Sequence, residues 1–293
     1  MLLQRLKSKE LINCHEWLVD NVHYLTIMGS NAYGVSSDSS DEDIYGFCIP
    51  KKDMIFPHLK GEIVGFGRQE EKFEVWQQHH IKDKETNKQY DFQIFSIIKY
   101  FQLCMGCNPN MIDSLFTPRR CIIHTTQVGE LVRENRYMFL HKGAFHRFKG
   151  YAYSQMHKMD IKKPEGKRKE MVDEFGYDLK FAYHVVRLLN ECQMILDECD
   201  LDLERNREEL KSIRRGEWTL DQIKDYFTMK EKILEKSYSE SKLPYFPDEN
   251  AIKVLLLRCL EQHFGSLDKA IYIENKHKAA LREISEICKR VGL

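Results

Sequence analysis

The chain has 293 residues, of which 42% are hydrophobic and 31% are charged, a composition that excludes a disordered or collagen-like protein. Basic and acidic residues number 45 each, and the zero net charge excludes a protein that coats nucleic acid by bulk positive charge. The length predicts about two domains.

The distribution of apolar residues and cysteines predicts the cellular compartment of the protein. The longest apolar stretches are too short to cross a membrane, and residues 1–10 alternate charge with leucine and offer no signal-peptide core. The nine cysteines form an odd set without the spacing of a disulfide framework, which is typical of reduced thiols. We therefore expect a cytoplasmic protein with no membrane partner.

The first 125 residues are predicted to mix helices with strands, which gives an α+β fold. Residues 11–20 have the apolar spacing of a helix. Strands are expected at 22–28, 43–49, 72–77 and 88–95, the last two joined as a hairpin by a lysine-rich turn. A helix over 95–104 follows, and Asn108-Pro109-Asn110 predicts another helix with Pro109 at its first position.

After residue 125 the apolar spacing is helical almost throughout. Helices are expected at 145–158, 177–199, 219–236, 249–263 and 267–290. Thr219 and Gln222 form a capping-box pattern, which marks the start of the third of these helices. The change of period predicts a mixed α+β domain over residues 1–125 and an all-helical domain over residues 126–293.

The strongest functional signal joins a Gly-Ser pair to two aspartates. A predicted strand ends at Gly29-Ser30, where the free N–H groups of a short helix and a serine hydroxyl would form an anion site. About ten residues further on, Asp41 and Asp43 open a strand at positions i and i+2, so both carboxylates are expected on one side. Two carboxylates near a phosphate suit one or two hard divalent cations.

Each half of this pattern also has a plain structural interpretation. Gly-Ser and Asp-x-Asp both recur by chance in turns, and residues 36–43 would then be a solvated loop whose aspartates cap a turn. The joint order of strand, Gly-Ser, loop, Asp-x-Asp and strand is far more specific than either half. This order favours a site for metal and phosphate.

At these residues the chain resembles the nucleotidyltransferases of the DNA polymerase β superfamily, whose signature is Gly-Ser followed at a short distance by Asp-x-(Asp or Glu). The longer forms GSNAYG and SDEDIYG are similar to one branch, the RNA repair pathway DNA polymerase β family of RlaP-like nucleotidyltransferases. The resemblance continues in family order through GCNPNMIDSLFTP, FKGYAYSQ, YDLKFAYHVVRLL and IRRGEWTLDQI. It implies a polymerase β-like catalytic domain with a mixed sheet, followed by a helical domain that binds nucleotide and acceptor.

The superfamily uses a third carboxylate on a neighbouring strand. Asp91, in the predicted strand KQYDFQIF, is the best match, and Asp113 and Glu74 are the fallbacks. The plain alternative for Asp91 is a strand-edge aspartate that faces water.

The resemblance also assigns roles around these carboxylates. It implies that Asp41, Asp43 and Asp91 hold two Mg²⁺ ions, for which Mn²⁺ would substitute, and that Asp91 helps to activate the acceptor hydroxyl. Gly29 and Ser30 would cradle the β- and γ-phosphates of an NTP.

Lys180, His184 and Arg187 lie at i, i+4 and i+7, so they share one face of a predicted helix. The resemblance implies that this face looks into the active site and binds the nucleotide. Arg187 is the strongest candidate of the three, because a guanidinium matches phosphate geometry. A solvated cationic stripe is the plain alternative.

A basic segment lies upstream of this helix. Between residues 158 and 169, six basic residues outweigh two acidic ones, and Tyr151 and Tyr153 precede them. Basic side chains beside aromatic rings can bind single-stranded nucleic acid, although a charge run is also typical of a solvated loop. The candidate acceptor-binding residues are Lys162, Lys163, Lys167, Arg168 and Lys169.

Two other groups of metal-binding residue types are weaker candidates. Cys104, Cys107, Cys121 and His124 have a spacing that a zinc site would accept. Cys104 lies on a predicted apolar helix and Cys121 begins an apolar stretch, so both are expected to be buried small residues. The pair His79-His80 has no partner at a metal-ligand spacing.

These features predict a metal-dependent nucleotidyltransferase that transfers NMP from an NTP to an acceptor hydroxyl and releases pyrophosphate. An RNA 3′-OH is the favoured acceptor. Transfer to a protein or small molecule, such as AMPylation in a toxin–antitoxin-like role, stays open, and the zero net charge mildly favours it. A non-catalytic nucleotide- or RNA-binding module is the alternative of another class, but such a module would not need both Asp41 and Asp43.

Overall fold

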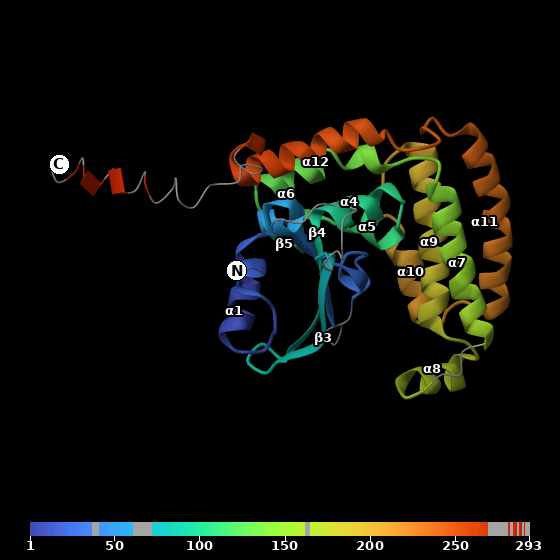
Figure 1. Cartoon of the computed structure of the whole chain (residues 1–293). Helices are drawn as coiled ribbons and strands as arrows, with labels where there is room; N and C mark the ends of the chain where they lie inside the picture. The colour runs from blue at the N-terminus through green and yellow to red at the C-terminus, as the bar shows by residue number, and fades with distance from the viewer. Residues whose placement is uncertain are drawn as a thin grey trace.

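A computed structural model of the chain describes residues 1–36, 41–60, 72–161 and 165–268, together with residues 281, 284, 285, 287, 288 and 290. Five strands form a sheet in the order β3-β4-β2-β1-β5 (Figure 1). They are β1 (Val22–Ile27), β2 (Glu42–Cys48), β3 (Val75–Asp83), β4 (Lys88–Ser96) and β5 (Ile122–Thr125). Strands β2 and β4 run parallel and the other neighbours are antiparallel, so the predicted α+β fold with a mixed sheet is confirmed.

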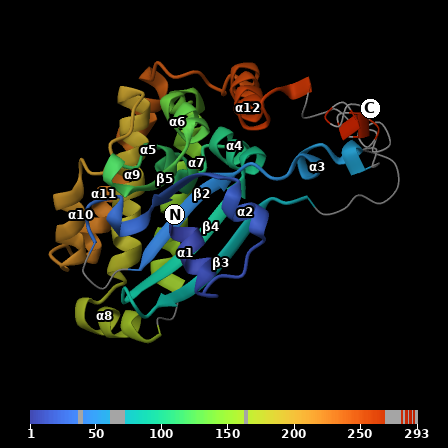
Figure 2. The same ribbon diagram turned by 90° about the vertical axis from the view of Figure 1, so that its left-hand side faces the viewer.

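The two faces of the sheet carry different cores, because side chains alternate along a strand. Leu25 and Ile44 belong to the smaller core, on the face covered by α1 (Leu2–Ser8) and α2 (Glu16–Asp20) (Figure 2). Phe47 belongs to the larger core, on the face covered by the remaining helices. Asp43 lies four residues before Phe47 on the same strand, so it shares this second face.

Two short helices, α4 (Ile97–Met105) and α5 (Pro109–Phe116), pack in the larger core, and both have side-chain caps. The Ser96 hydroxyl accepts a hydrogen bond from the Lys99 amide, and the Asn108 side chain accepts one from the Met111 amide. Pro109 takes the first position of α5, as predicted. The remaining short elements are α3 (Lys52–Ile55), η1 (Gly29–Asn31), η2 (Pro57–Lys60), η3 (Arg119–Cys121) and η4 (Arg136–Phe139), where η denotes a 3₁₀ helix.

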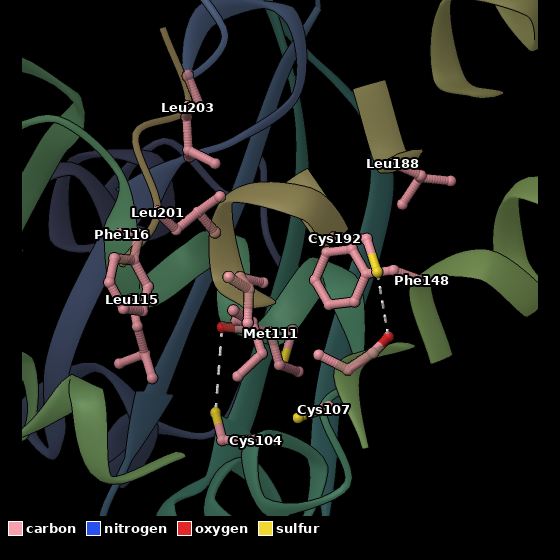
Figure 3. Close-up of a cluster of buried hydrophobic side chains, with 14 of the residues drawn as sticks. Cys104, Cys107, Met111, Leu115, Phe116, Phe148, Leu188, Cys192, Leu201 and Leu203 are labelled. Atoms are coloured by element: carbon pink, nitrogen blue, oxygen red, sulfur yellow. Dashed lines mark hydrogen bonds between the residues drawn. The ribbon is translucent and has the colours of Figure 1, made fainter. Parts of the chain in front are cut away.

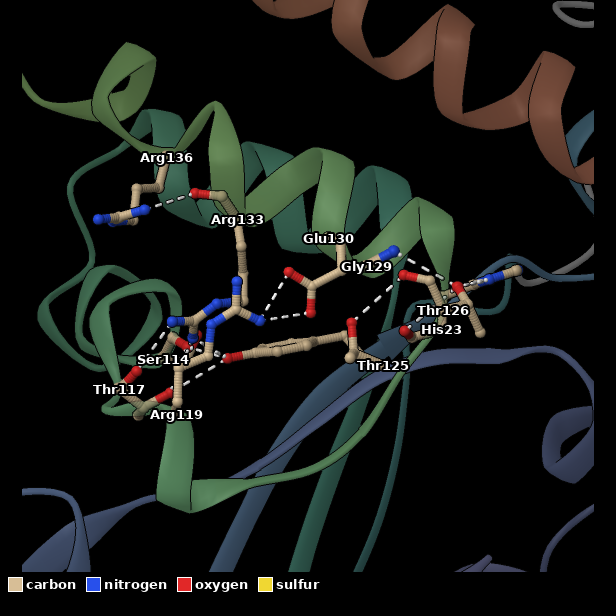
Figure 4. Close-up of polar contacts among 11 residues, drawn as sticks. His23, Ser114, Thr117, Arg119, Thr125, Thr126, Gly129, Glu130, Arg133 and Arg136 are labelled. Atoms are coloured by element: carbon tan, nitrogen blue, oxygen red, sulfur yellow. Dashed lines mark hydrogen bonds and ion pairs between the residues drawn. The ribbon is translucent and has the colours of Figure 1, made fainter.

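Helix α6 (Gln127–Glu134) is fixed to the sheet at both of its ends. At its start, a Cβ on Gly129 would lie 2.4 Å from the backbone oxygen of His23, so only glycine allows this approach. At its end, the buried guanidinium of Arg133 donates to the Tyr24 hydroxyl at 2.9 Å and to the Thr117 carbonyl at 3.0 Å (Figure 4). These contacts join α6 to β1 and to the residue that follows α5.

The C-terminal part of the chain is helical. Its helices are α7 (Ala144–Ile161), α8 (Lys167–Phe175), α9 (Leu179–Glu198), α10 (Arg207–Arg214), α11 (Leu220–Glu240) and α12 (Glu249–Phe264). Figure 1 shows α7, α9 and α11 side by side, with α9 between the sheet and the outer helices, and α12 above α6. The predicted capping box of Thr219 and Gln222 opens α11.

The larger core is continuous across residue 125, since it includes Tyr100 before that position and Leu189 after it. A domain boundary between residues 125 and 126 therefore stays a prediction. The helix expected at 267–290 lies mostly outside the described residues. Within the described ranges, no helix is both long enough and apolar enough to cross a membrane.

Candidate active site

Two aspartates lie side by side on the parallel strands at the centre of the sheet. In the β2/β4 ladder, Asp43 is the direct partner of Asp91, so their side chains leave the sheet on the same face. This is the face that looks toward α7 and α9. Of the three candidates for the third carboxylate, Asp91 is thus the one that the fold places beside Asp43.

The Gly-Ser pair meets Asp43 at the end of β1. The Met28 amide donates to the carbonyl oxygen of Asp43 at 2.7 Å, and the chain then turns through Gly29, whose φ is +63°. A Cβ on Gly29 would lie only 2.6 Å from Asp43 Oδ2. Glycine is therefore required at residue 29 for two reasons: the backbone has a positive φ, and the Asp43 carboxylate leaves no room for a Cβ. Ser30, next in the 3₁₀ turn η1, is half-buried.

The electrostatic setting of Asp43 is unfavourable for its charge. Burial raises the pKa of this carboxyl, the nearby charge of Asp91 raises it further, and Asp41 acts in the same direction. Lys180 and His79 oppose the shift. Asp41 itself is exposed and immediately precedes β2. In the described part of the chain, neither Asp41 nor Asp43 forms an ion pair with a lysine or arginine.

This donor set fits a hard divalent cation. Mg²⁺ is commonly bound by one or two protein carboxylates and completed by water and substrate phosphates, without a closed protein cage. Among the described residues, no three carboxylate, imidazole or thiol groups already converge into a metal cluster. The pair Asp43 and Asp91, with Asp41 at its edge, thus has the character of an open site that oxygen atoms from outside the protein would complete.

Helix α9 presents its first turns to this site. The side chain of Asp178 caps the helix by accepting hydrogen bonds from the Lys180 and Phe181 amides. Lys180 is exposed, and its charge lowers the pKa of Asp43. One turn later, burial and then the neighbouring cations Arg187 and Lys180 hold the pKa of His184 well below its ordinary value. His184 is therefore neutral near pH 7.

Arg187 differs from what we expected, because its guanidinium is buried and already surrounded by oxygen atoms. Its Nη1 atom donates to Asp113 Oδ2 at 2.5 Å, to the Tyr33 hydroxyl at 2.7 Å and to the Glu191 carboxylate at 3.0 Å. Seven residues advance a helix by about 10 Å. This advance takes the residue from the rim, where Lys180 lies, into the core.

The two fallback carboxylates are occupied by other partners. Asp113 is fully buried, and it is held by Arg187 and by the Tyr33 hydroxyl at 2.7 Å. Glu74 precedes β3 and forms an ion pair with Lys99 at 2.8 Å. Both therefore have structural partners of their own.

The structure describes the candidate acceptor-binding segment only in part. Lys162 and Lys163 lie outside the described residues, and so does the side chain of Lys167. Arg168 forms an ion pair with Asp178, the N-cap of α9, at 3.3 Å. Lys169 is exposed. Of the described side chains in this set, Lys169 is the one that faces solvent.

The cysteine and histidine residues with zinc-like spacing point in different directions. Cys104 and Cys107 lie among apolar side chains of the larger core, and the Sγ atom of Cys104 approaches the carbonyl oxygen of Met111 (Figure 3). The Sγ atom of Cys107 approaches the carbonyl oxygen of Phe139. Burial raises the pKa of the Cys107 thiol to about 12. Cys121 instead contacts the carbonyl oxygen of Asn31, and His124 lies 3.3 Å from that of Val22.

Sequence reasoning missed two residues that lie at the site. The imidazole of His79 lies 3.8 Å from Asp91 Oδ2, and the amide of His80 donates to Asp91 Oδ1. Both were set aside because neither has a partner at a metal-ligand spacing. Their position in the predicted hairpin could have indicated this, because the hairpin brings the residues at the end of its first strand opposite Asp91.

Comparison with known proteins agrees with this geometry. A search of curated proteins found no significant match. The model of the family described as RlaP, RNA repair pathway DNA polymerase beta family, matches residues 3–248, which include every strand of the sheet and both aspartates. The chain therefore belongs to the RNA repair pathway DNA polymerase beta family, whose name indicates a polymerase beta-like nucleotidyltransferase.

Proposed function

We propose that the protein transfers NMP from an NTP to an acceptor hydroxyl, with an RNA 3′-OH as the acceptor and a divalent cation as the cofactor. One observation carries the proposal: Asp43 and Asp91 lie side by side beneath Gly29, and in the described chain no lysine or arginine pairs with them. Two carboxylates held together in this way repel each other when both are charged, and a bound divalent cation would remove that repulsion.

The cofactor would be Mg²⁺ or Mn²⁺ held by Asp41, Asp43 and Asp91, where it would neutralise charge that develops on the phosphates. The acceptor oxygen would form a bond to the α-phosphorus while the bond to the bridging oxygen breaks and pyrophosphate leaves. The carboxylate of Asp91 would take the proton of the acceptor hydroxyl. The position of Asp91 beside Asp43 on the neighbouring strand supports this assignment.

The remaining groups of the site would bind the nucleotide. Gly29 and Ser30 would lie against the β- and γ-phosphates, because their turn packs directly beside Asp43, which would hold the cation that those phosphates bind. The exposed ammonium of Lys180 would bind a phosphate oxygen, and the neutral imidazole of His184 would offer a hydrogen bond. Arg187 is not included, because its contacts are with Asp113, Tyr33 and Glu191.

The chemistry is tested by incubating the protein with each α-labelled NTP, Mg²⁺, and either an RNA oligonucleotide or a cell extract. We expect label on the RNA, loss of labelling with EDTA, recovery with Mg²⁺ or Mn²⁺, and an unchanged circular dichroism spectrum throughout. Label on a polypeptide, together with RNA binding that does not depend on salt, would instead indicate protein modification. NTP binding without transfer to either acceptor would indicate a binding module.

The acceptor is tested separately through the basic segment. Changing Lys167 and Lys169 to glutamine leaves Arg168 in its ion pair with Asp178. We expect a several-fold higher KM for RNA, an unchanged KM for NTP, and a log–log salt dependence of binding that is shallower by ~0.7 for each lost contact with a single strand. Glutamine at the exposed residues Lys224 and Lys232 of α11 is the matched control. An unchanged KM for RNA would place the RNA contact elsewhere.

A further inference from the structure

Strand β3 is irregular at the point where it passes Asp91. In the β3/β4 ladder, Gln78 pairs with Phe92 and the next pair is Ile81 with Tyr90. Three steps on β3 therefore match two steps on β4, and both His79 and His80 oppose the single residue Asp91. This is a β-bulge, a feature that locally breaks the ladder and redirects a side chain or an amide group.

The bulge redirects the backbone of His80. Its φ is +58°, in the left-handed region where residues other than glycine are uncommon and where histidine is among the enriched types. In this conformation its amide N–H donates to Asp91 Oδ1 at 2.6 Å. The hydrogen bond thus joins the backbone of one strand to the carboxylate of the next. A regular antiparallel pair would direct this amide to a backbone carbonyl or to solvent.

The two oxygen atoms of Asp91 have different surroundings as a result. Oδ1 accepts the His80 amide, whereas Oδ2 has no hydrogen-bond donor in the described part of the chain. The Nδ1 atom of His79 lies 3.8 Å from Oδ2, beyond hydrogen-bonding distance. The side chain of His80 is 78% exposed, and its Nδ1 lies 3.4 Å from Gln89 Nε2 and 4.0 Å from Asp91 Oδ1, so the short contact with the carboxylate comes from the amide.

We propose that the His79–His80 bulge is a positioning element for Asp91 in nucleotidyl transfer. It fixes the rotation of the carboxylate through Oδ1 and keeps Oδ2 available to the substrate. This inference rests on the proposed function, in which Asp91 accepts the proton of the acceptor hydroxyl. Small errors in the placement of such a group are costly, because the reacting atoms must meet in a narrow range of geometries.

A purely structural role for the bulge makes a different prediction. Strand β3 is at the edge of the sheet, and bulges on edge strands prevent pairing with other chains. In that case the conformation of His80 would affect solubility and stability, but it would affect neither turnover nor the environment of Asp91.

Substitutions at residue 80 separate these roles, because they change the backbone preference. His80→Val disfavours a positive φ and should return β3 toward a regular ladder, with a loss of the amide contact. We expect kcat to fall by ~10–100-fold, the range for loss of a partner that orients a reactive group, with an unchanged KM for NTP. His80→Gly accepts the positive φ and retains the amide, so it should keep most of the turnover.

The matched control is Lys82→Val, which places the same β-branched residue on the same exposed edge at a regular pairing position. Its kcat should equal that of the unchanged protein. His79→Ala removes the imidazole near Oδ2 and tests the side chain by itself. We expect a smaller effect than that of His80→Val, because the positioning contact comes from the backbone.

A spectroscopic measurement tests the contact without any turnover. An amide that donates a short bond to a carboxylate should give a downfield-shifted proton resonance for residue 80. The shift should persist in His80→Gly and in Asp43→Asn, and it should be lost in Asp91→Ala and His80→Val. Titration of the nucleotide-free protein with Mn²⁺, followed by electron paramagnetic resonance, should give weaker binding for His80→Val than for Lys82→Val.

The outcomes separate this inference from the proposed function. If labelled NMP is never transferred but the resonance of residue 80 responds to Asp91→Ala, the bulge holds Asp91 and the proposed function is wrong. If transfer occurs and His80→Val retains full kcat, the positioning role is overturned. A His79→Ala variant as slow as His80→Val would also overturn it, because the imidazole and not the backbone would then set the position of Asp91.

Discussion

Within the described residues, two pairs of neighbouring carboxylates on the larger-core side of the sheet differ in their partners. Asp43 and Asp91 lie side by side on the parallel strands at the centre of the sheet, without a lysine or arginine paired to them in the described chain. Asp113 and Glu191 are fully buried, and both accept hydrogen bonds from the guanidinium of Arg187. The second pair has its cation built into the chain, whereas in the described residues the first pair has no lysine or arginine partner.

This difference distinguishes a structural ion cluster from a candidate cofactor site. Burial raises the pKa of Glu191 well above its ordinary value, and the charge of Arg187 opposes that shift. Tyr33, from the segment after Gly29-Ser30, joins the same cluster through its hydroxyl. The buried pair thus ties the loop that is expected to hold phosphate to α5 and α9.

The largest effect on stability is expected from removing the cation of the buried cluster of Asp113, Arg187 and Glu191. Arg187→Met leaves two buried carboxylates without their cation, and such a loss costs ~3–5 kcal/mol of the free energy of unfolding. Urea denaturation should show this loss. The triple variant Asp113→Asn, Arg187→Met, Glu191→Gln should recover much of it, because it removes the charges together.

This prediction also decides between two roles for Arg187. Normal stability of Arg187→Met together with a raised KM for NTP would show that the guanidinium binds phosphate, as its sequence position first suggested. Lys180→Met provides the comparison, because Lys180 is exposed and should change KM without changing stability.

The next largest effect is expected from a substitution of Asp43, and it concerns catalysis. Asp43→Asn should lower nucleotidyl transfer by at least ~100-fold, since the cation that it would hold stabilises charge on the phosphates by several kcal/mol. The metal-free variant should be at least as stable as the unchanged protein, because the substitution removes a carboxylate whose pKa is raised by burial and by Asp91.

Thermal unfolding in EDTA and single-turnover incorporation of labelled NMP measure the two quantities. Near-normal incorporation by Asp43→Asn would remove the basis for calling the pair a cofactor site. A large loss of stability would instead place Asp43 in the same class as Asp113.

A smaller effect, on the pH dependence of stability, is expected from the buried histidine His23, which stays neutral in the folded protein. His23 lies 2.7 Å from the Thr126 hydroxyl through Nδ1 and 2.9 Å from Nδ1 of His263 through Nε2. Burial, and then the nearby His263 and His124, lower the pKa of His23 to about 4. Because the folded form binds this proton less readily than the unfolded form, stability is lost as pH falls from about 6.5 toward about 4.

Between pH 7 and pH 5 this difference amounts to ~2 kcal/mol for His23. His23→Gln should therefore show a shallower pH dependence than the unchanged protein in urea denaturation at the two pH values. The subtraction isolates His23 from His184, whose pKa is also lowered. Equal pH dependence in the two proteins would mean that His23 takes up its proton in the folded state.

Four of the five strands, the third of them only in part, and the long helices could be predicted from local pattern, whereas β5 was not predicted. β1 and β2 are strands of β-branched and aromatic residues between clear breaks, and α9 has apolar residues at helical spacing over its whole length. The helices α1, α6, α8 and α10 were not predicted, since each has at most nine residues and a short pattern cannot separate a helix from a loop. Their positions depend on tertiary packing.

The candidate site was also predictable in part. Gly29 and Asp43 belong to one contiguous motif, and their contact follows from the order of strand, turn and strand. The bulge at His80 depends on a one-residue offset between β3 and β4, which no periodicity encodes. The burial of Arg187 was missed because helical spacing gives the face of a residue but not its depth along the axis.

Helix α12 follows the part of the chain that is common to the family, yet its side chains complete the protein's interior. Ile252, Leu255, Cys259 and Leu260 are buried, and the helix packs on α6 and α4. A recombinant fragment designed to stop where the family pattern stops would expose the apolar faces beneath α12 and leave His23 without its partner. Expression boundaries for this protein should therefore be drawn beyond Phe264, because a fragment ending at residue 248 would tend to aggregate through that uncovered surface.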